Sequence, residues 1–309
     1  MRVLVIGGTH LSGPFLVEAL VSAGHEVFLC HRGEHEAPLP PEVAHIHGDK
    51  ADLHGALGSE LRALDADVVV HMVAFTRDDG RAFMDTFGGH AGRVVVPSSA
   101  DVYRAFGRIH RTEPGSPDPV PLREDAPLRE RLSIHGEEYE KRWVEAEVLR
   151  DTRLPGTVLR YPAIYGPGDR RLSKYVQQMV DDAPVILLED GEDTWRFARA
   201  YAANVAHAAL LAVTLDRSAG EVFNVAEQYA YTEREWVEQV AAVVGWHGEI
   251  VTQPAGEMPP RPFSGLDWRQ DLTLETAKIR TVLGYTEPVD PSDGIRSTVV
   301  WERANPPAA

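Results

Sequence analysis

A glycine-rich turn near the start of the chain has the residue types and spacing to hold a phosphate group. It runs Gly7-Gly8-Thr9-His10-Leu11-Ser12-Gly13. Backbone N–H groups in such a turn, together with the positive end of a following helix, can bind the pyrophosphate of a dinucleotide. The spacing fits G-x-x-G-x-x-G except that His10 replaces the middle glycine. His10 either donates a hydrogen bond to a phosphate or faces solvent, and we expect the phosphate contacts to come from Gly7, Thr9, His10 and Gly13.

The elements around this turn are those that position a phosphate-binding loop. The apolar run from Arg2 to Ile6 predicts a strand before it, and Pro14 followed by apolar residues at helical spacing predicts a helix after it. Further strands are predicted at Glu26–Cys30, Ala44–His47, Asp67–Met72, Arg93–Val96, Thr157–Arg160 and Val222–Val225, with crossover helices over 13–24, 52–64, 137–150 and 204–215. This alternation predicts an α/β fold, a Rossmann-type doubly wound parallel sheet.

The pattern also predicts two parts of unequal size. Residues 1–169, rejoined by 201–227, are expected to form the dinucleotide-binding Rossmann domain. The strict alternation decays after Pro167, so residues 170–200 and 228–309 are expected to form a smaller C-terminal substrate-binding lobe. The stretch 112–127 is rich in proline and acidic residues and predicts a loop.

Composition excludes several classes of function. The 309 residues carry a formal net charge of −16 with scattered basic residues, so no nucleic acid partner is expected. Cys30 is the single cysteine and the thirteen histidines form no H-E-x-x-H pattern, so no metal site is expected. The sequence has no basic leader segment and no apolar run of roughly 18 residues, which predicts a cytoplasmic protein with no membrane contact.

In doubly wound sheets, ligands bind at the carboxyl ends of the strands, and here those ends are chemically distinctive. After the glycine-rich turn, the successive predicted strands end in His31-Arg32-Gly33, Gly48-Asp49-Lys50, Val73-Ala74-Phe75, Ser98-Ser99-Ala100-Asp101-Val102-Tyr103 and Tyr161-Pro162-Ala163-Ile164-Tyr165-Gly166-Pro167-Gly168-Asp169.

Taken in order, these segments resemble the extended short-chain dehydrogenase/reductase superfamily and, within it, the NAD-dependent epimerase/dehydratase family. The matching motifs are the glycine-rich turn, VVVHMVA, PSSADVY, LRYPAIYGPGD, GEVFNVAE and RQDLTLETAKIRTVLGYTEP, which together cover nearly the whole chain. The resemblance implies a nicotinamide coenzyme in the Rossmann domain. It implies that the adenine amino group donates to Asp49, although Asp49 also suits a plain turn, and that Lys50, Val73, Lys141 and Pro162 line the coenzyme.

The end of the second predicted strand bears on the choice of coenzyme. A carboxylate at this point would bind the ribose 2′-hydroxyl of NAD, but the chain has Cys30, His31 and Arg32 instead. A cationic group suits a 2′-phosphate, so NADP is favoured slightly over NAD. The alternative is that Arg32 is a solvated loop residue.

The acid–base residues are where the chain departs from the family. Members couple a serine or threonine with a tyrosine and a lysine four residues apart on one helix face, and Ser99 occupies the serine position. If Lys141 is in register, Glu137 takes the tyrosine position; if Tyr139 is in register, Trp143 takes the lysine position. The run Lys141-Arg142-Trp143-Val144-Glu145 resembles the family's K-x-x-V-E and favours the first register.

On an ideal helix, Tyr139 and Lys141 are about 200° apart and do not share a face. Glu137 is therefore a candidate base beside Tyr139, although an acidic helix start facing solvent would also explain it. For the substrate, the resemblance points to Tyr165, Arg196 and Arg199, since sugar-nucleotide enzymes of the family present an arginine to a substrate phosphate near this point. The alternative is that one arginine pairs with a neighbouring carboxylate, since an acidic segment precedes them: Glu189, Asp190, Glu192 and Asp193.

The combined prediction is an NAD(P)-dependent oxidoreductase or epimerase/dehydratase. It would act by hydride transfer on a secondary alcohol or ketone of a small molecule. A sugar or a sugar nucleotide is one candidate for that molecule. The disturbed Tyr–Lys spacing leaves open a coenzyme-binding sensor or scaffold without redox catalysis. An RNA-binding member of the superfamily is a further alternative, and family resemblance suggests a homodimer.

Overall fold

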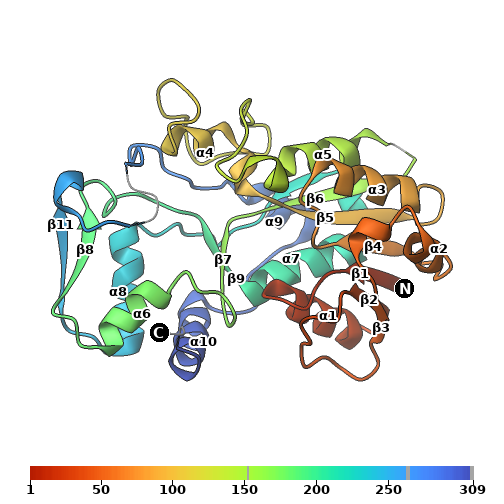
Figure 1. Cartoon of the computed structure of the whole chain (residues 1–309), viewed down its shortest axis with the longest axis horizontal. Coiled ribbons are helices and arrows are strands. Elements are labelled where there is room, and N and C mark those ends of the chain that lie inside the picture. The colour runs from red at the N-terminus through yellow and green to blue at the C-terminus, as the bar shows by residue number, and fades with distance from the viewer. Residues whose placement is uncertain (152, 262–264, 307–309) are drawn as a thin grey trace.

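A seven-stranded parallel sheet forms the centre of the larger lobe (Figure 1). The computed structural model describes residues 1–151, 153–261 and 265–306. The strands are β1 (Arg2–Ile6), β2 (Glu26–His31), β3 (Ala44–His47), β4 (Val68–His71), β5 (Arg93–Ser99), β6 (Gly156–Tyr161) and β10 (Val222–Asn224). Their order is β10-β6-β5-β4-β1-β2-β3, and each neighbouring pair is parallel. The predicted Rossmann-type fold is confirmed.

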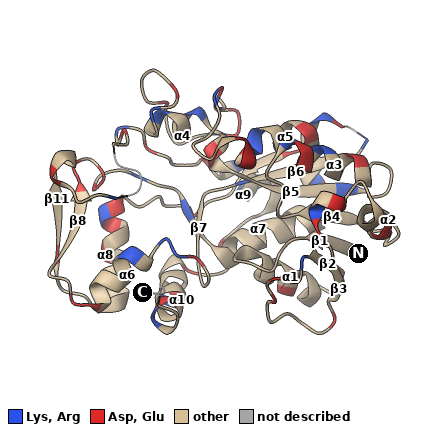
Figure 2. Ribbon diagram, viewed as in Figure 1, with Lys and Arg blue, Asp and Glu red and all other residues tan. Residues whose placement is uncertain are grey.

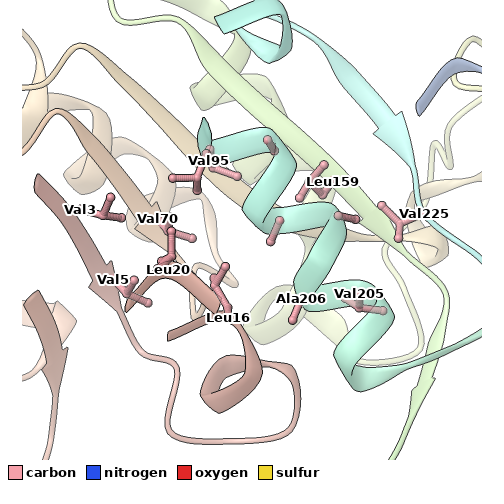
Figure 3. Packing of buried hydrophobic residues seen from close by; sticks show 14 of the residues in the cluster. Val3, Val5, Leu16, Leu20, Val70, Val95, Leu159, Val205, Ala206 and Val225 are labelled. Carbon is pink, nitrogen blue, oxygen red and sulfur yellow. The ribbon is translucent and has the colours of Figure 1, made fainter. Parts of the chain in front are cut away.

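Helices cover both faces of this sheet because successive side chains of a strand point to opposite faces. Val3 and Val5 of β1 pack in one cluster with helices α1 (Ser12–Ser22) and α7 (Ala202–Thr214), as Figure 3 shows. Leu4 and Ile6 pack on the other face, which is covered by α2 (Ala56–Arg62), α3 (Arg77–Phe87) and α5 (Lys141–Arg150). Because helices cover both faces of the sheet, a ligand can reach it at the carboxyl ends of the strands.

The smaller lobe lies at the left of Figure 1 and has its own apolar core. Its elements are α6 (Ser173–Val180), β8 (Val185–Glu189), α8 (Glu233–Val244), β11 (Glu249–Gln253) and α10 (Pro291–Ala304). Strands β8 and β11 form a parallel pair. The short strands β7 (Ala163–Tyr165) and β9 (Arg199–Tyr201) pair with each other between the lobes, while α4 (Arg104–Ile109) and α9 (Ala277–Leu283) complete the helices of the described residues.

One predicted helix differs from the structure in a way that affects the site. A continuous helix over 137–150 is wrong, because residues Gly136–Tyr139 form a short 3-10 turn and α5 begins only at Lys141. Between them, Glu140 has φ −124° and ψ 81°, which is not helical. The predicted helix over 52–64 likewise begins late, since α2 follows a separate 3-10 turn at Lys50–Asp52.

Charged residues are distributed over both lobes. Figure 2 shows Lys and Arg interspersed with Asp and Glu along the ribbon. Within the described ranges, no helix is both long enough and apolar enough to span a bilayer.

Candidate functional site

A cavity of about 490 Å³ lies at the carboxyl ends of the central strands. The glycine-rich turn after β1 forms its middle, the segments after β2 and β3 form one end, and the segments after β5 and β6 form the other. Its lining includes Gly7, Thr9, His10, Arg32, Glu34, Asp49, Lys50, Val73, Phe75, Ser99, Tyr139, Lys141, Pro162 and Arg171. The cavity therefore gathers the predicted coenzyme residues Gly7, Thr9, His10, Arg32, Asp49, Lys50, Val73, Lys141 and Pro162 from segments far apart in the chain.

The glycine-rich turn has the backbone geometry that its glycines permit. Gly7 and Gly8 have φ of +78° and +115°, in the region that favours glycine. A Cβ on Gly7 would lie 2.8 Å from the Val73 side chain, so only glycine fits there. Gly13 lies in the first turn of α1, whose N-cap residue Leu11 makes no side-chain capping bond. The Gly13 N–H is bonded to the His10 carbonyl (2.8 Å) and Pro14 has no N–H, so Ser12 supplies the N–H of this first turn that suits an anion.

His10 is exposed at the rim of this turn, where its ring lies edge-on to that of His35 with the centroids 4.5 Å apart. At the neighbouring end of the cavity, Arg32 and Glu34 form an exposed ion pair with a nitrogen–oxygen distance of 2.8 Å. The Asp49 carboxylate accepts a hydrogen bond from the Ala51 N–H (2.9 Å) and caps a short turn. The roles of His10, Arg32 and Asp49 toward a coenzyme stay predictions.

Histidines gather beside this end of the cavity, which the sequence analysis did not foresee. His31 Nε2 lies 2.9 Å from His45 Nδ1, and the Gly33 N–H donates to His31 Nδ1. The metal-ligating atoms of His31, Glu36 and His45 lie within 4.8 Å of one another. Burial, followed by the charge of His45, lowers the pKa of His31. The hydrogen bond between the two imidazoles accounts for their contact without a metal.

Lys50 anchors the turn that follows β4. Its Nζ donates to the Asp79 carboxylate (2.5 Å) and to the Val73 carbonyl (2.8 Å). The same carboxylate accepts the backbone N–H groups of Phe75 and Thr76. These bonds fix the backbone at Phe75, whose ring is close to both lysines of the cavity, with Lys50 Nζ 4.8 Å and Lys141 Nζ 4.7 Å from its centroid.

Lys141 is buried at the far end of the cavity, with 3% of its surface exposed. Its Nζ donates to the carbonyls of Ala74 (2.6 Å) and Pro97 (3.1 Å) and lies 5.4 Å from the centroid of the Tyr139 ring. Burial lowers the pKa of Lys141 to about 8. An ammonium group in this position can hold a coenzyme hydroxyl and favour negative charge on a neighbouring phenol.

Tyr139 reaches the same end of the cavity, which the Ser99 side chain also lines. Burial, followed by the charge of Asp101, raises the pKa of Tyr139 to about 12. Tyr139 and Lys141 are only two residues apart, yet both line the cavity because the helix begins at Lys141. The structure thus brings Ser99, Tyr139 and Lys141 together.

Glu137 lies elsewhere. Its side chain is exposed in the 3-10 turn, and it is absent from the residues that line the cavity. Trp143, the residue four positions after Tyr139, lies with its ring 5.1 Å from the Arg77 guanidinium. Neither helical register considered from the sequence describes this geometry.

Three charged residues next to the site were missed from the sequence. Glu140 and Arg129 have completely buried side chains and form an ion pair with a nitrogen–oxygen distance of 3.0 Å. Asp101 is 5% exposed, and its Oδ1 lacks a hydrogen-bond partner among the described residues. Burial raises the pKa of Asp101 to about 6. Asp101 comes two residues after Ser99, and this proximity was the only sign in the sequence that Asp101 lies next to the site.

The predicted substrate residues are placed outside the cavity lining. Tyr165 is buried, and its hydroxyl donates to Glu227 (2.8 Å). Arg199 is paired with Glu233 and lies 4.6 Å from the Trp236 ring centroid. Arg196 donates to the Ala230 carbonyl (2.9 Å) and lies 3.5 Å from the Glu235 carboxylate. Both arginines therefore pair with carboxylates, on α8 instead of on the acidic segment that precedes them.

Comparison with known proteins places this site in context. The family model of the NAD dependent epimerase/dehydratase family matches residues 3–226. The chain is 29% identical to the 2'-dehydrokanamycin reductase of Streptomyces kanamyceticus, over 82% of this chain and 70% of that protein. It is also 29% identical to the 2-alkyl-3-oxoalkanoate reductase of Stenotrophomonas maltophilia, over 79% of this chain and 76% of that protein. The Bordetella bronchiseptica enzyme WbmG, solved in complex with NAD, has a similar fold, with a TM-score of 0.73, 20% identity and coverage of 99% of this chain and 94% of WbmG.

Proposed function

Because the chain belongs to the NAD dependent epimerase/dehydratase family, we propose that it is a carbonyl reductase that transfers hydride from a bound nicotinamide coenzyme to a ketone carbon. The observation that carries the proposal is the meeting of Ser99, Tyr139 and Lys141 at one end of a cavity whose middle is a phosphate-binding turn. A scaffold without redox chemistry would not require these three groups to meet.

The proton chemistry fits Tyr139 as the general acid of a reduction. A phenol whose pKa is about 12 stays protonated at neutral pH and acts as a general acid. Tyr139 would donate its proton to the carbonyl oxygen as the alcohol forms, while the Ser99 hydroxyl orients that oxygen. Lys141, held by two carbonyls, would stabilise the phenolate that remains.

The residues present fit a dinucleotide. The Gly7–Gly13 turn would hold the pyrophosphate, Asp49 the adenine and Lys141 the nicotinamide ribose, and the bound coenzyme would supply the hydride. Arg32, exposed at the adenosine end, would contact a 2′-phosphate, which is why we favour NADP. Glu34 beside it is the group that would instead favour the free 2′-hydroxyl of NAD.

The substrate we propose is a ketone that lacks a nucleoside diphosphate. Arg196 and Arg199, the two cations expected to meet a substrate phosphate, are paired with Glu235 and Glu233. Releasing Arg199 would leave the buried carboxylate of Glu233 without its ion-pair partner and with only the Tyr175 hydroxyl donating to it (2.6 Å), which is costly. The names of the two reductases compared above fit this substrate class.

The test is reduction of a carbonyl panel by the purified protein. NADPH is mixed with aminoglycoside ketones, 3-oxo acids, simple ketones and keto sugar nucleotides, and loss of the reduced-coenzyme absorbance is followed. We expect turnover with non-nucleotide ketones, and a Tyr139→Phe variant that binds NADPH normally but reduces the substrate about 10²- to 10⁴-fold more slowly. Tight NADPH binding with no turnover of any ketone would instead identify a coenzyme-binding scaffold.

A further inference from the structure

The 3-10 turn and the helix that present Tyr139 and Lys141 meet at a buried cluster of charge. The Glu140 carboxylate accepts hydrogen bonds from two guanidinium groups: Arg129 at 3.1 and 3.0 Å, and Arg142 at 2.9 and 3.0 Å. The Ser133 N–H donates to it at 3.3 Å. Five donors thus surround one carboxylate that has no exposed surface. They compensate its buried charge, which would be strongly destabilising if it were unpaired.

This cluster is bonded to every segment that carries a proposed catalytic group. Arg129 also donates to the backbone carbonyl of Asp101, two residues after Ser99. The Glu140 N–H donates to the Phe75 carbonyl (2.9 Å), beside the Ala74 carbonyl that holds Lys141. On the other side of the break, the Ser133 hydroxyl donates to the Tyr139 carbonyl (3.2 Å).

The backbone at Glu140 makes the Tyr139–Lys141 pair possible. A regular helix through residues 137–150 would turn Tyr139 about 200° away from Lys141. With φ −124° and ψ 81° at Glu140, the helix starts only at Lys141 and both side chains line the cavity. Nothing in the local sequence requires a break here, because no glycine or proline lies between Glu137 and Arg150.

We propose that Glu140 is a positioning residue: its carboxylate, held between Arg129 and Arg142, fixes the break that brings Tyr139 and Lys141 to the reacting end of the cavity. The consequence for catalysis rests on the proposed reductase function, whereas the structural consequence does not. Glu140 itself is absent from the cavity lining and acts through its two neighbours.

The test uses the position of Lys141 as its readout, because the chain has only four lysines: Lys50, Lys141, Lys174 and Lys278. Lys141 Nζ lies over the rings of Phe75 and Tyr139, so ring currents should shift its ε-CH₂ protons upfield. Protein labelled with ¹³C-lysine gives four such signals, and a Lys141→Met variant identifies the one from Lys141.

In Glu140→Gln we expect the Lys141 signal to move toward the position of a free lysine while the Lys174 and Lys278 signals stay in place. Glu138→Gln, in the same turn but exposed, is the matched control and should leave all four signals unchanged. With a ketone substrate, kcat of Glu140→Gln should fall on the order of 100-fold, whereas KM for NADPH should rise by much less, since Lys141 is only one of the proposed coenzyme contacts.

A folded Glu140→Gln protein whose Lys141 signal coincides with that of the wild type would overturn the proposal. If Glu140→Gln does not fold, Arg142→Gln replaces it, since this variant keeps the Arg129–Glu140 pair; it should move the Lys141 signal in the same direction by less, and an unmoved signal there also overturns the proposal. The lysine spectra need neither substrate nor turnover. A displaced Lys141 in a protein that reduces no ketone would therefore support the positioning role and refute the reductase function.

Discussion

Replacing Arg32 by glutamate should turn the coenzyme preference away from NADP. Arg32 lies at the adenosine end of the cavity with 58% of its side chain exposed, paired with Glu34. The substitution changes the local charge by two units, and a phosphate monoester carries about 1.5 to 2 negative charges at neutral pH. One pair of unit charges about 4 Å apart in water contributes about 1 kcal/mol, so charge reversal costs about 3–4 kcal/mol before screening.

Salt and the exposure of Arg32 reduce this figure to about 2–3 kcal/mol, which corresponds to a roughly 30- to 150-fold rise in Kd for NADPH. NADH lacks the 2′-phosphate, and its Kd should change by less than about threefold. The assay is fluorescence titration of both reduced coenzymes at two salt concentrations. The loss of NADPH affinity should shrink at higher salt, since an exposed contact is screened.

Glu34→Gln is the matched variant. Removing this carboxylate frees Arg32 and should strengthen NADPH binding several-fold while leaving NADH unchanged. Equal weakening of NADPH and NADH in Arg32→Glu would refute a contact with the 2′-phosphate. A selective loss of NADH affinity in Glu34→Gln would show instead that Glu34 binds the ribose hydroxyl of NAD.

Three further predictions follow from the site. The double variant Glu137→Tyr/Tyr139→Phe should remain as slow as Tyr139→Phe in single-turnover reduction, because residue 137 is exposed and precedes the helix break; recovered activity would contradict the Tyr139 assignment. Asp101→Asn should raise the free energy of unfolding at pH 7.5 by about 1–3 kcal/mol, because a folded-state pKa of about 6 against an unfolded value of 3.8 means that the carboxylate destabilises the fold once ionised. That gain should disappear near pH 3 in urea titrations, below both pKa values, where both states hold the proton, and the same gain at both pH values would contradict it. The kcat/KM for reduction should fall above about pH 8 as Lys141 loses its proton, and Lys141→Arg should abolish this fall; a profile that is flat to pH 10 in the wild type would contradict a role for the lysine charge.

The sequence predicted those features of the fold that depend on residues close together in the chain. Strand periodicity located β1 to β6 and β10, and the rule that ligands meet strand ends placed Gly7, Asp49 and Ser99 around one cavity. The predicted helix over 137–150 was wrong because the break at Glu140 is set by tertiary bonds. Arg129 lies eleven residues before Glu140, and Phe75 lies farther still in the sequence. Helical periodicity therefore cannot predict either contact.

Contacts between residues distant in the sequence also explain why the predicted substrate residues are not free to bind a phosphate. Arg196 and Arg199 pair with carboxylates of α8, more than thirty residues later in the chain, and the nearby acidic segment pairs elsewhere: Glu189 and Glu192 both bind Arg261. The nearby acidic residues correctly suggested that an arginine forms an ion pair, but they are not the residues with which Arg196 and Arg199 pair.

Direct transfer of isotope tests the central claim most directly. NADPH carrying deuterium at the transferable C4 position is incubated with the protein and a non-nucleotide ketone, and the product is analysed by mass spectrometry and NMR. We predict that deuterium appears on the new carbinol carbon, at a rate that Tyr139→Phe lowers about 10²- to 10⁴-fold. Bound NADPH that transfers no deuterium to any ketone would contradict the account.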